Sequence, residues 1–520
     1  MPPRHALLAL VVLGTLLRLA LAASLGPSND EAYYSLFAVH PDWSYFDHPP
    51  LVGVLIWVGR TIASGHISVL ALRAAFIGLF AGSTWLMARL AGRLYGPKAG
   101  LLAALALNVT GYYGIVAGSC ALPDGPLVFF WLLTLERLAA ALESPRAVGL
   151  WVAVGLAWGG ALLSKYHAVF LPAGFLLWAC LDHDARRFLK QPGPYIAFGI
   201  GVLAFSPVLW WNAHHGWVSF LFQGRRALGP VGLRLDLLAA ALVGQAGYLF
   251  PWMWLMVLVA GFKCARGFFR ETSQAERLLL CQAFWPLTVF FAVACQRPVL
   301  PHWSLVAFLG LFPLVGRTWA ERLAANPVRQ RRRLVLVTAL PVALAAFLAI
   351  QGRTGVCEKN GLIAGPADPT VDLFGWDQVA KALADRGVLG QPGIFLFTST
   401  WYQSAQLAFA VDHRIPVACY HPHDSRGFAL WSHPDDWVGR DGILVAIDNR
   451  SIEPGCFDRW FARIAPLGQF PIVRGGLPVH TVRLFRCERQ LQPFPFDASS
   501  PPASLPQMVA RRWFGVGKRR

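Results

Sequence analysis

The sequence contains few charged residues for its length. Of its 520 residues, only 14% are Asp, Glu, Lys or Arg, against roughly a quarter in ordinary soluble domains. Hydrophobic residues make up 55% of the chain, and the mean hydropathy is +0.47. This shortage of charge excludes a soluble enzyme, a disordered chain and a secreted disulfide-rich module. It predicts a polytopic α-helical membrane protein.

Three further absences narrow the class of protein. None of the nine Cys residues forms a CxxC pair, which argues against a zinc ribbon. No internal repeat is recognisable, which argues against the repeat architecture of many transporters. Acidic residues are scarce, so that the net charge is +18. The basic residues are scattered between long apolar runs and do not form one water-facing surface, so this charge does not indicate nucleic-acid binding.

Long apolar runs recur through the first two thirds of the chain. A helix of about 20 mainly apolar residues crosses a bilayer. We predict eleven such spans, at 6–23, 66–88, 99–117, 126–142, 149–163, 168–182, 195–211, 238–262, 279–295, 302–316 and 334–350. The apolar stretch 51–63 is shorter and follows two prolines, so a re-entrant or interfacial helix is expected there.

The distribution of basic residues predicts the topology. With the N-terminus inside, eighteen Lys and Arg residues fall in the inner segments and six in the outer loops. Cytoplasmic segments carry such an excess of positive charge. We therefore predict an N-in chain, and an odd number of spans then places everything after Gln351 on the outer side.

The chain divides into three predicted segments. Residues 1–350 form the membrane domain, which carries most of the excess positive charge. Residues 351–500 are more polar, and two β-like runs at 393–397 and 442–447 flank a helical pattern at 403–411. This order predicts a small periplasmic α/β domain. Residues 501–520 are expected to form a disordered basic tail.

Four cysteines lie in the predicted outer domain, namely Cys357, Cys419, Cys456 and Cys487. An oxidising compartment permits one or two disulfides among them, and their pairing stays open.

Ionisable residues gather in the predicted outer loops. Acids and imidazoles stand beside aromatic residues there, whereas the inner loops hold mostly Arg and Lys. Ionisable groups in spans and in short loops between them are costly, and they therefore mark functional sites. Structural alternatives remain for each residue: acids that begin a helix can cap it, and a lysine at a helix end can extend to the membrane interface.

The chemistry of these residues favours group transfer. A carboxylate can accept the proton of an attacking hydroxyl, and a carboxylate pair can also hold a metal. Lys, Arg and His can neutralise a departing phosphate. Because nucleotide sugars are not supplied outside the cytoplasm, a transferase there needs an activated donor in the membrane. A polyprenyl-phosphate sugar meets this need.

Two sequence motifs in the first outer loop resemble a known family. They read Asp30-Glu31-Ala32-Tyr33-Tyr34 and Tyr45-Phe46-Asp47-His48-Pro49-Pro50-Leu51. Together they resemble the first outer loop of GT-C integral-membrane glycosyltransferases, in the family 39 and dolichyl-phosphate-mannose–protein mannosyltransferase-like group. This group includes bacterial aminoarabinose and galacturonic acid transferases that modify lipid A. Softer matches are Pro123-Asp124-Gly125-Pro126-Leu127, Leu163-Ser164-Lys165-Tyr166 and the segment 402–409.

The resemblance implies a GT-C fold and a specific reaction. The chain would be an inverting glycosyltransferase of a bacterial inner membrane. It would move a sugar from a polyprenyl-phosphate donor to lipid A, another glycan or a protein on the periplasmic face. Asp30 would be the catalytic base, Glu31 an orienting or metal-binding group, and Asp124 a second acidic contributor. The implied substrate contacts are Asp47, His48, Lys165, Arg73 and Arg297, and the ionisable residues of the outer loops add His167 and His302 as predicted contacts.

The resemblance dictates no metal ligands. A divalent metal ion as a cofactor stays open, as do the identities of the sugar and the acceptor. Two other functions compete with the enzyme: a transporter or flippase for a lipid-linked substrate, and a membrane scaffold whose outer domain binds a partner. The position of the charges in loops on one side, away from the bilayer midplane, argues against transport. A scaffold would leave the clustered acids and imidazoles unexplained.

Overall fold

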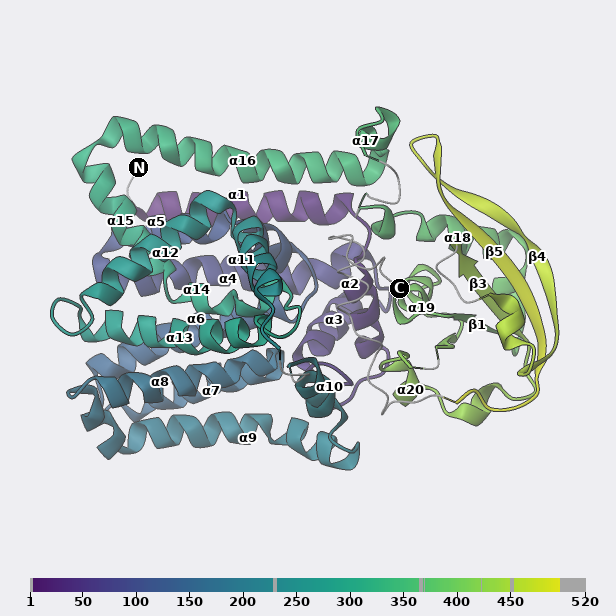
Figure 1. The fold of residues 1–520 in the computed structure, drawn as a ribbon, viewed down its shortest axis with the longest axis horizontal. Coiled ribbons are helices and arrows are strands. Elements are labelled where there is room, and N and C mark those ends of the chain that lie inside the picture. The colour runs from purple at the N-terminus through teal and green to yellow at the C-terminus, as the bar shows by residue number, and fades with distance from the viewer. Residues whose placement is uncertain are drawn as a thin grey trace.

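The protein consists of a helical bundle with a sheet-containing domain at one end (Figure 1). The computed structural model describes residues 3–227, 232–363, 368, 370–421, 423–448 and 453–495. The chain up to Thr354 forms the bundle, and the C-terminal domain follows. We call the end of the bundle that meets this domain the domain end. The predicted tail, 501–520, lies outside the described residues.

Six helices within the described ranges are long and apolar enough to cross a membrane: α1 (Pro3–Ser24), α4 (Val69–Tyr95), α6 (Asp124–Glu143), α9 (Pro192–His214), α13 (Gln274–Ala294) and α16 (Pro327–Thr354). Three bent pairs also pass this test together: α5 (Pro97–Asn108) with a π-helix (Gly111–Ala117), α11 (Leu235–Leu249) with α12 (Pro251–Arg266), and Pro301–Leu309 with α15 (Phe312–Ala325). Counting each bent pair as one span gives up to nine spans by length and composition.

All eleven predicted spans coincide with helices, but the structure does not confirm their number. The two runs left over are α7 (Val148–Ser164) and Tyr166–Leu181, which includes α8 (Phe170–Leu181). Both are apolar but shorter than 18 residues. The count of eleven and the N-in orientation therefore stay predictions. The stretch 51–63 forms the short helix α3 (Leu51–Ile62), as expected.

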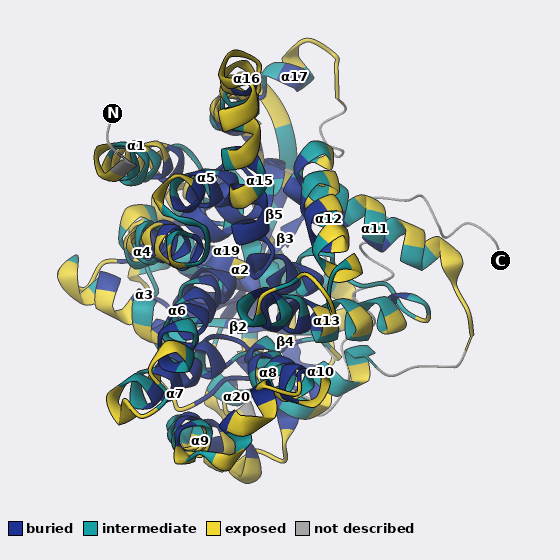
Figure 2. Ribbon diagram, turned by 90° about the vertical axis from the view of Figure 1, so that its left-hand side faces the viewer, coloured by how far each residue is buried: buried dark blue, intermediate teal, exposed yellow. Residues whose placement is uncertain are grey.

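The outermost helices expose apolar side chains, as a membrane-spanning bundle must. On α1, Leu8, Leu13 and Leu16 are exposed, and α16 exposes Val335 and Leu336. Helices α1 and α16 lie side by side along one edge of the bundle (Figure 1). Buried residues concentrate in the middle of the bundle and exposed ones on its rim (Figure 2). A lipid surround removes the cost of this exposed apolar surface.

The C-terminal domain is built on a five-stranded mixed sheet. Its strands stand in the order β2-β1-β3-β5-β4. Strand β1 (Phe395–Thr398) is parallel to its neighbours β2 (Val417–Cys419) and β3 (Gly442–Ile447). Helix α19 (Trp401–Ala410) connects β1 to β2, and α18 (Trp376–Asp385) precedes β1. The two predicted strands and the helix between them thus match β1, β3 and α19.

A long antiparallel hairpin completes the sheet. Strands β4 (Phe461–Arg474) and β5 (Leu477–Gln490) pair with each other, and β5 pairs with β3. The sequence does not predict this hairpin, because β4 contains a glycine and two prolines, which are depleted in strands. All nine cysteines lie in the described part of the chain and are free thiols, so the permitted disulfides are not formed here.

The C-terminal domain is anchored on the first loop of the bundle. Gln406 of α19 donates to the carbonyl of Pro27 at 2.9 Å and to Asn29 Oδ1 at 3.1 Å. Tyr33 accepts a hydrogen bond from the backbone N–H of Gly427 at 3.0 Å. A Cβ on Gly427 would lie 2.8 Å from the Tyr33 hydroxyl, so only glycine permits this approach. These contacts hold the domain against the motif that carries Asp30 and Glu31.

Candidate active site

The short helix α2 (Asn29–Ser35) presents the first acidic motif. Its N-cap is Ser28, whose Oγ accepts from the backbone N–H of Glu31 at 3.2 Å. The Glu31 carboxylate accepts in return from the Ser28 N–H at 2.8 Å. This reciprocal capping box fixes the start of the helix. The structural alternative considered for Glu31, helix capping, is therefore present in the fold.

Glu31 is fully buried and its oxygens are occupied. Arg73 of α4 donates to Oε1 and Oε2, each at 2.7 Å, and the N–H of Ala121 donates to Oε1 at 2.8 Å. Burial alone would raise the pKa of Glu31, but the charge and hydrogen bonds of Arg73 outweigh it and hold the pKa below its usual range. Bidentate pairs of this kind add geometric specificity as well as energy.

Arg73 is fully engaged in holding this part of the chain together. Beyond its two bonds to Glu31, it donates to the carbonyls of Ala22 and Leu25 at 2.9 Å and of Gly26 at 2.8 Å. These contacts use all five N–H bonds of a guanidinium. The sequence resemblance implies that Arg73 contacts substrate. The geometry instead favours a positioning role, in which Arg73 joins the end of α1 to α2.

Asp30 differs from its neighbour in having an open carboxylate. The residue is exposed, and no hydrogen bond or ion pair to its carboxylate is found within the described ranges. The surrounding protein nevertheless desolvates it enough to raise its pKa, against the attraction of Arg426 and Arg226. A carboxylate that is both accessible and more basic than usual is suited to accept a proton.

The second motif forms a turn whose polar side chains face inward. Asp47 is buried, and this burial raises its pKa to about 6. Burial likewise holds the pKa of His48 well below its usual range, so that His48 is neutral. Asp47 does not cap α3, whose N-cap is Pro50. Its carbonyl instead accepts from Gln223 of α10 (Val218–Ala227) at 2.7 Å.

Asp124 and Lys165 form a buried ion pair. Lys165 Nζ lies 2.8 and 2.9 Å from the two oxygens of Asp124, which is the first residue of α6. Lys165 is only 5% exposed, so it does not extend to the membrane interface. His167 stacks on Phe290 with ring centroids 5.1 Å apart, and its Nε2 has no hydrogen-bond partner. The pair brings together two residues that the softer sequence matches single out.

Of the two remaining predicted substrate contacts, one lies near the Asp124–Lys165 pair and the other contacts α10. His302 stacks on Tyr112 with ring centroids 5.5 Å apart and lies within electrostatic range of Asp124. Arg297 donates to the carbonyl of Arg225 at 3.0 Å. The structure thus places His302 near the pair and Arg297 against the C-terminal turn of α10.

Two arginines that sequence reasoning missed are part of this site. Arg226 lies at the end of α10, its guanidinium 4.5 Å from the centre of the Trp303 ring. Arg426 comes from the C-terminal domain and lies 3.6 Å from Asp47. Both act electrostatically on Asp30. The sequence offers no spacing signal for Arg426, because it lies in another domain. Arg226 shows only as one of the few basic residues in the predicted outer loops.

Several buried polar atoms in this region lack a hydrogen-bond partner within the described chain: Asp47 Oδ1, His48 Nδ1, Ser44 Oγ, His167 Nε2 and Arg426 Nε. Buried polar atoms in native proteins are almost always paired with protein or water. Their concentration around the two sequence motifs indicates a site for a polar ligand.

The donor set does not fit a divalent metal ion. No group of three or more His, Cys, Asp or Glu side chains that could hold a metal occurs among the residues described. Both oxygens of Glu31, which the resemblance implies as a metal-binding group, receive hydrogen bonds from Arg73. We therefore derive no step through a metal.

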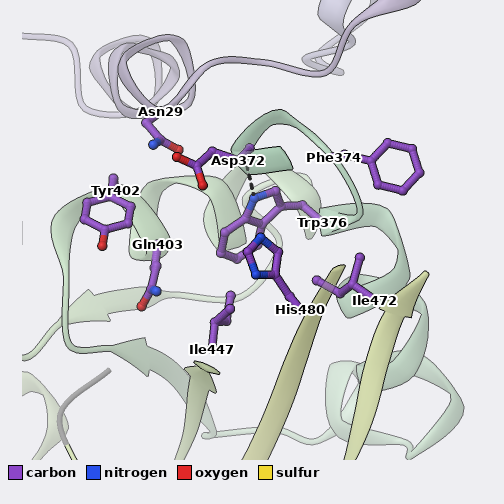
Figure 3. Close-up of a pocket in the computed structure, with 9 residues that line it drawn as sticks. All are labelled: Asn29, Asp372, Phe374, Trp376, Tyr402, Gln403, Ile447, Ile472 and His480. Carbon is purple, nitrogen blue, oxygen red and sulfur yellow. Dashed lines mark hydrogen bonds between the residues drawn. The ribbon is translucent and has the colours of Figure 1, made fainter. Parts of the chain in front are cut away.

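A small pocket lies where α2 meets the C-terminal domain (Figure 3). It is small and partly open, and it is lined by Asn29, Asp372, Phe374, Trp376, Tyr402, Gln403, Ile447, Ile472 and His480. Asn29 reaches into it from α2, toward Asp372 and Tyr402 (Figure 3). The neighbour of Asp30 is thus in contact with a hollow at the domain junction.

Comparisons of sequence find glycosyltransferases. The family model described as dolichyl-phosphate-mannose-protein mannosyltransferase matches residues 47–211, less than half of the chain. Lipid A galacturonosyltransferase RgtD of Rhizobium johnstonii is 24% identical over 317 residues. That match covers 59% of this chain and 64% of the relative, slightly less than two thirds of its length.

Comparisons with solved structures find the same fold in ArnT. ArnT from Cupriavidus metallidurans bound to undecaprenyl phosphate superimposes with a TM-score of 0.61 and 16% identity, over 92% of this chain and 97% of ArnT. The apo state of ArnT gives 0.60 and 16%, over 92% and 98%. At this identity the likeness establishes the fold. Together these matches confirm the predicted resemblance: the chain is similar in sequence to the GT-C integral-membrane glycosyltransferases and shares their fold.

Proposed function

We propose that the chain is an inverting glycosyltransferase that moves a sugar from a polyprenyl-phosphate donor to an envelope acceptor. The observation that carries this proposal is the contrast between Asp30 and Glu31. The Glu31 carboxylate is locked by Arg73, whereas the adjacent Asp30 carboxylate is open and has a raised pKa. The crystal structure of ArnT bound to undecaprenyl phosphate supports a lipid-phosphate donor.

The proposed step is a single displacement at the anomeric carbon of the sugar. The acceptor hydroxyl oxygen forms a bond to this carbon, while the bond from the carbon to the phosphate oxygen breaks. Asp30 takes the hydroxyl proton, and polyprenyl phosphate leaves with the bonding electron pair. Attack from the face opposite the phosphate inverts the configuration. A base of this kind contributes about 10²–10⁴-fold to the rate.

Cations near Asp30 would stabilise the departing phosphate. Arg226 is the best placed on the membrane domain, because no carboxylate within the described ranges pairs with it. Lys165 is neutralised by Asp124, so we assign that pair to shaping the site. Neutral His48 contributes a hydrogen-bonding ring nitrogen. Such fixed charges lower the energy of the transition state.

The proposal also includes the acceptor and the side of the membrane on which the sugar is transferred. RgtD is a lipid A galacturonosyltransferase by name, which supports lipid A as the acceptor. Another glycolipid, glycan or protein hydroxyl would fit the same chemistry. We place the reaction on the periplasmic face of a bacterial inner membrane, where the predicted N-in topology puts the C-terminal domain.

The direct test is release of the leaving group. Purified protein is incubated with polyprenyl-phosphate sugars of several kinds and an envelope lipid extract, and free polyprenyl phosphate is measured. We expect release that depends on the extract, together with labelled acceptor. If no donor is turned over while a labelled lipid-linked sugar crosses proteoliposome membranes, the chain is a transporter and the proposal is wrong.

Transfer should also depend on pH in a defined direction. Asp30 acts as a base only when ionised, and its raised pKa means that protonation begins at a higher pH than for an ordinary aspartate. The rate is therefore expected to fall as the pH is lowered through this raised pKa. The measurement is a profile of kcat against pH. The Asp47→Asn variant should keep this acid limb; if the limb disappears, it belongs to Asp47, whose pKa is about 6.

A further inference from the structure

Arg426 is held in an unusual way at the edge of the proposed site. It is 6% exposed, and its backbone has a φ of +48°, in the left-handed region that non-glycine residues seldom adopt. Strained backbone of this kind persists where the surroundings fix it, and it is concentrated at functional sites. Its guanidinium lies 3.5 Å from the centre of the Trp401 ring.

The charged partners of Arg426 stay at a distance. Asp47 Oδ2 and Asp424 Oδ1 are each 3.6 Å from its nitrogens, beyond the range of a good hydrogen bond. Arg426 Nε, Asp47 Oδ1 and Asp424 Oδ1 all lack hydrogen-bond partners within the described chain. The acids therefore lie close enough to attract the guanidinium and leave its Nε–H without a hydrogen bond. This buried Nε–H can still donate to a ligand.

Arg426 is brought close to the helix that carries Arg226. Gln223 of α10 binds the carbonyl of Asp47, and the Asp47 carboxylate faces Arg426. Arg226 follows Gln223 by three residues, which places both on one face of the helix. Leu430 of α20 (Phe428–Trp431), just after Arg426, packs against Phe46 and Phe222. The two domains thus meet around the Asp47 turn, with an arginine from each.

We propose that Arg226 and Arg426 together form a clamp for the phosphate of the lipid donor, so that the C-terminal domain supplies part of the donor site. The inference rests on the proposed function and adds a residue from the C-terminal domain to it. The charge of buried Arg426 acts unfavourably on that of half-buried Arg226, and an anion between them removes this cost. Arginine's fork of donors matches the oxygens of a phosphate. Docking of the C-terminal domain on α2 and α10 would then be a condition for donor binding.

The test measures binding of undecaprenyl phosphate to the full-length chain in detergent, by calorimetry. Arg426→Gln is expected to weaken binding about 10- to 100-fold, the usual effect of losing hydrogen bonds between charged groups. Arg459→Gln is the matched control, because Arg459 also lies over a tryptophan, Trp460, but is exposed. Its binding should equal that of the wild type. Arg426→Gln binding within twofold of the wild type would overturn the inference.

Two further variants show whether weaker binding comes from the lost contact with phosphate or from the uncompensated acids around Arg426. Arg426→Gln leaves Asp47 and Asp424 without their counter-charge, which could disturb the site indirectly. In the double variant Arg426→Gln with Asp424→Asn this imbalance is reduced. Donor binding should stay weak if Arg426 holds the phosphate, and its recovery in the double variant would overturn the inference. Arg426→Lys keeps the positive charge but loses the forked donors of the guanidinium, so its affinity for undecaprenyl phosphate should be intermediate. If Arg426→Gln does not fold, the affinity of Arg426→Lys tests the inference in its place.

Comparing the wild type with the Arg426 variants distinguishes an error in the clamp from an error in the proposed donor. If the wild type binds undecaprenyl phosphate and the Arg426 variants bind it equally well, only the clamp is wrong. If the wild type does not bind undecaprenyl phosphate at all, the lipid-phosphate donor is wrong, and the clamp fails with it.

Discussion

Replacing Asp30 with asparagine is expected to lower kcat for sugar transfer by about 10²–10⁴-fold while leaving the protein folded. Asn has nearly the same shape but cannot accept the proton of the attacking hydroxyl. The fold should tolerate the change, because no hydrogen bond or ion pair to the Asp30 carboxylate occurs among the described residues and the residue is exposed. The measurements are single-turnover transfer and thermal unfolding of the same preparation.

The matched control for this variant is Asp236→Asn. Asp236 is also exposed, and it lies in the first turn of α11, where it pairs with Arg234. Its loss should leave transfer unchanged. Binding of undecaprenyl phosphate by Asp30→Asn should equal that of the wild type or be slightly tighter, because a negative charge near the phosphate is removed. Transfer by Asp30→Asn at more than a tenth of the wild-type rate would reject Asp30 as the base.

Replacing Glu31 with glutamine is expected to destabilise the protein by about 3–5 kcal/mol, the usual cost of removing one partner of a buried ion pair. Arg73 would remain buried at 3% exposure with its charge uncompensated. The capping box of α2 would also be weakened. Thermal unfolding in detergent should show a large fall in Tm, and transfer should fall in proportion to the loss of folded protein.

Asp385→Asn provides the contrast for this prediction. It removes one partner of the exposed Lys381–Asp385 pair on α18, and such surface pairs contribute about 0.3–0.5 kcal/mol. Its Tm should stay close to that of the wild type. If Glu31→Gln unfolds at the wild-type temperature but has lost transfer, Glu31 acts in the chemistry and the positioning role is wrong.

These two predictions give a physical basis to the different roles that the sequence resemblance implies for two adjacent acids. Residue type alone does not distinguish them, because a carboxylate can be a base, a helix cap or a metal ligand. The tertiary structure separates them because Arg73 of α4 and the backbone of Ala121 converge on Glu31 and not on Asp30. Neither partner is close to Glu31 in sequence, so no local pattern could have indicated them.

For the predicted substrate contacts too, the sequence identified the residues and the tertiary structure decided what they contact. Lys165 and Asp124 were each identified from their own loops, and the structure joins them as a buried ion pair. Arg73 was expected to contact substrate, but every N–H of its guanidinium is directed at Glu31 or at backbone carbonyls. Residue type and position near a membrane surface identify costly charges. They do not reveal whether a charge faces a ligand or another part of the protein.

The sequence by itself determined that this protein is a helical membrane protein with a C-terminal α/β domain, because apolar runs and strand patterns are local properties of the chain. It also located the acidic motifs and their resemblance to GT-C glycosyltransferases. Only the tertiary structure decided which carboxylate is open and that Arg426 of the C-terminal domain faces Asp47. The physical reason is that desolvation and ion pairing depend on which segments pack together, and these segments are far apart in the sequence.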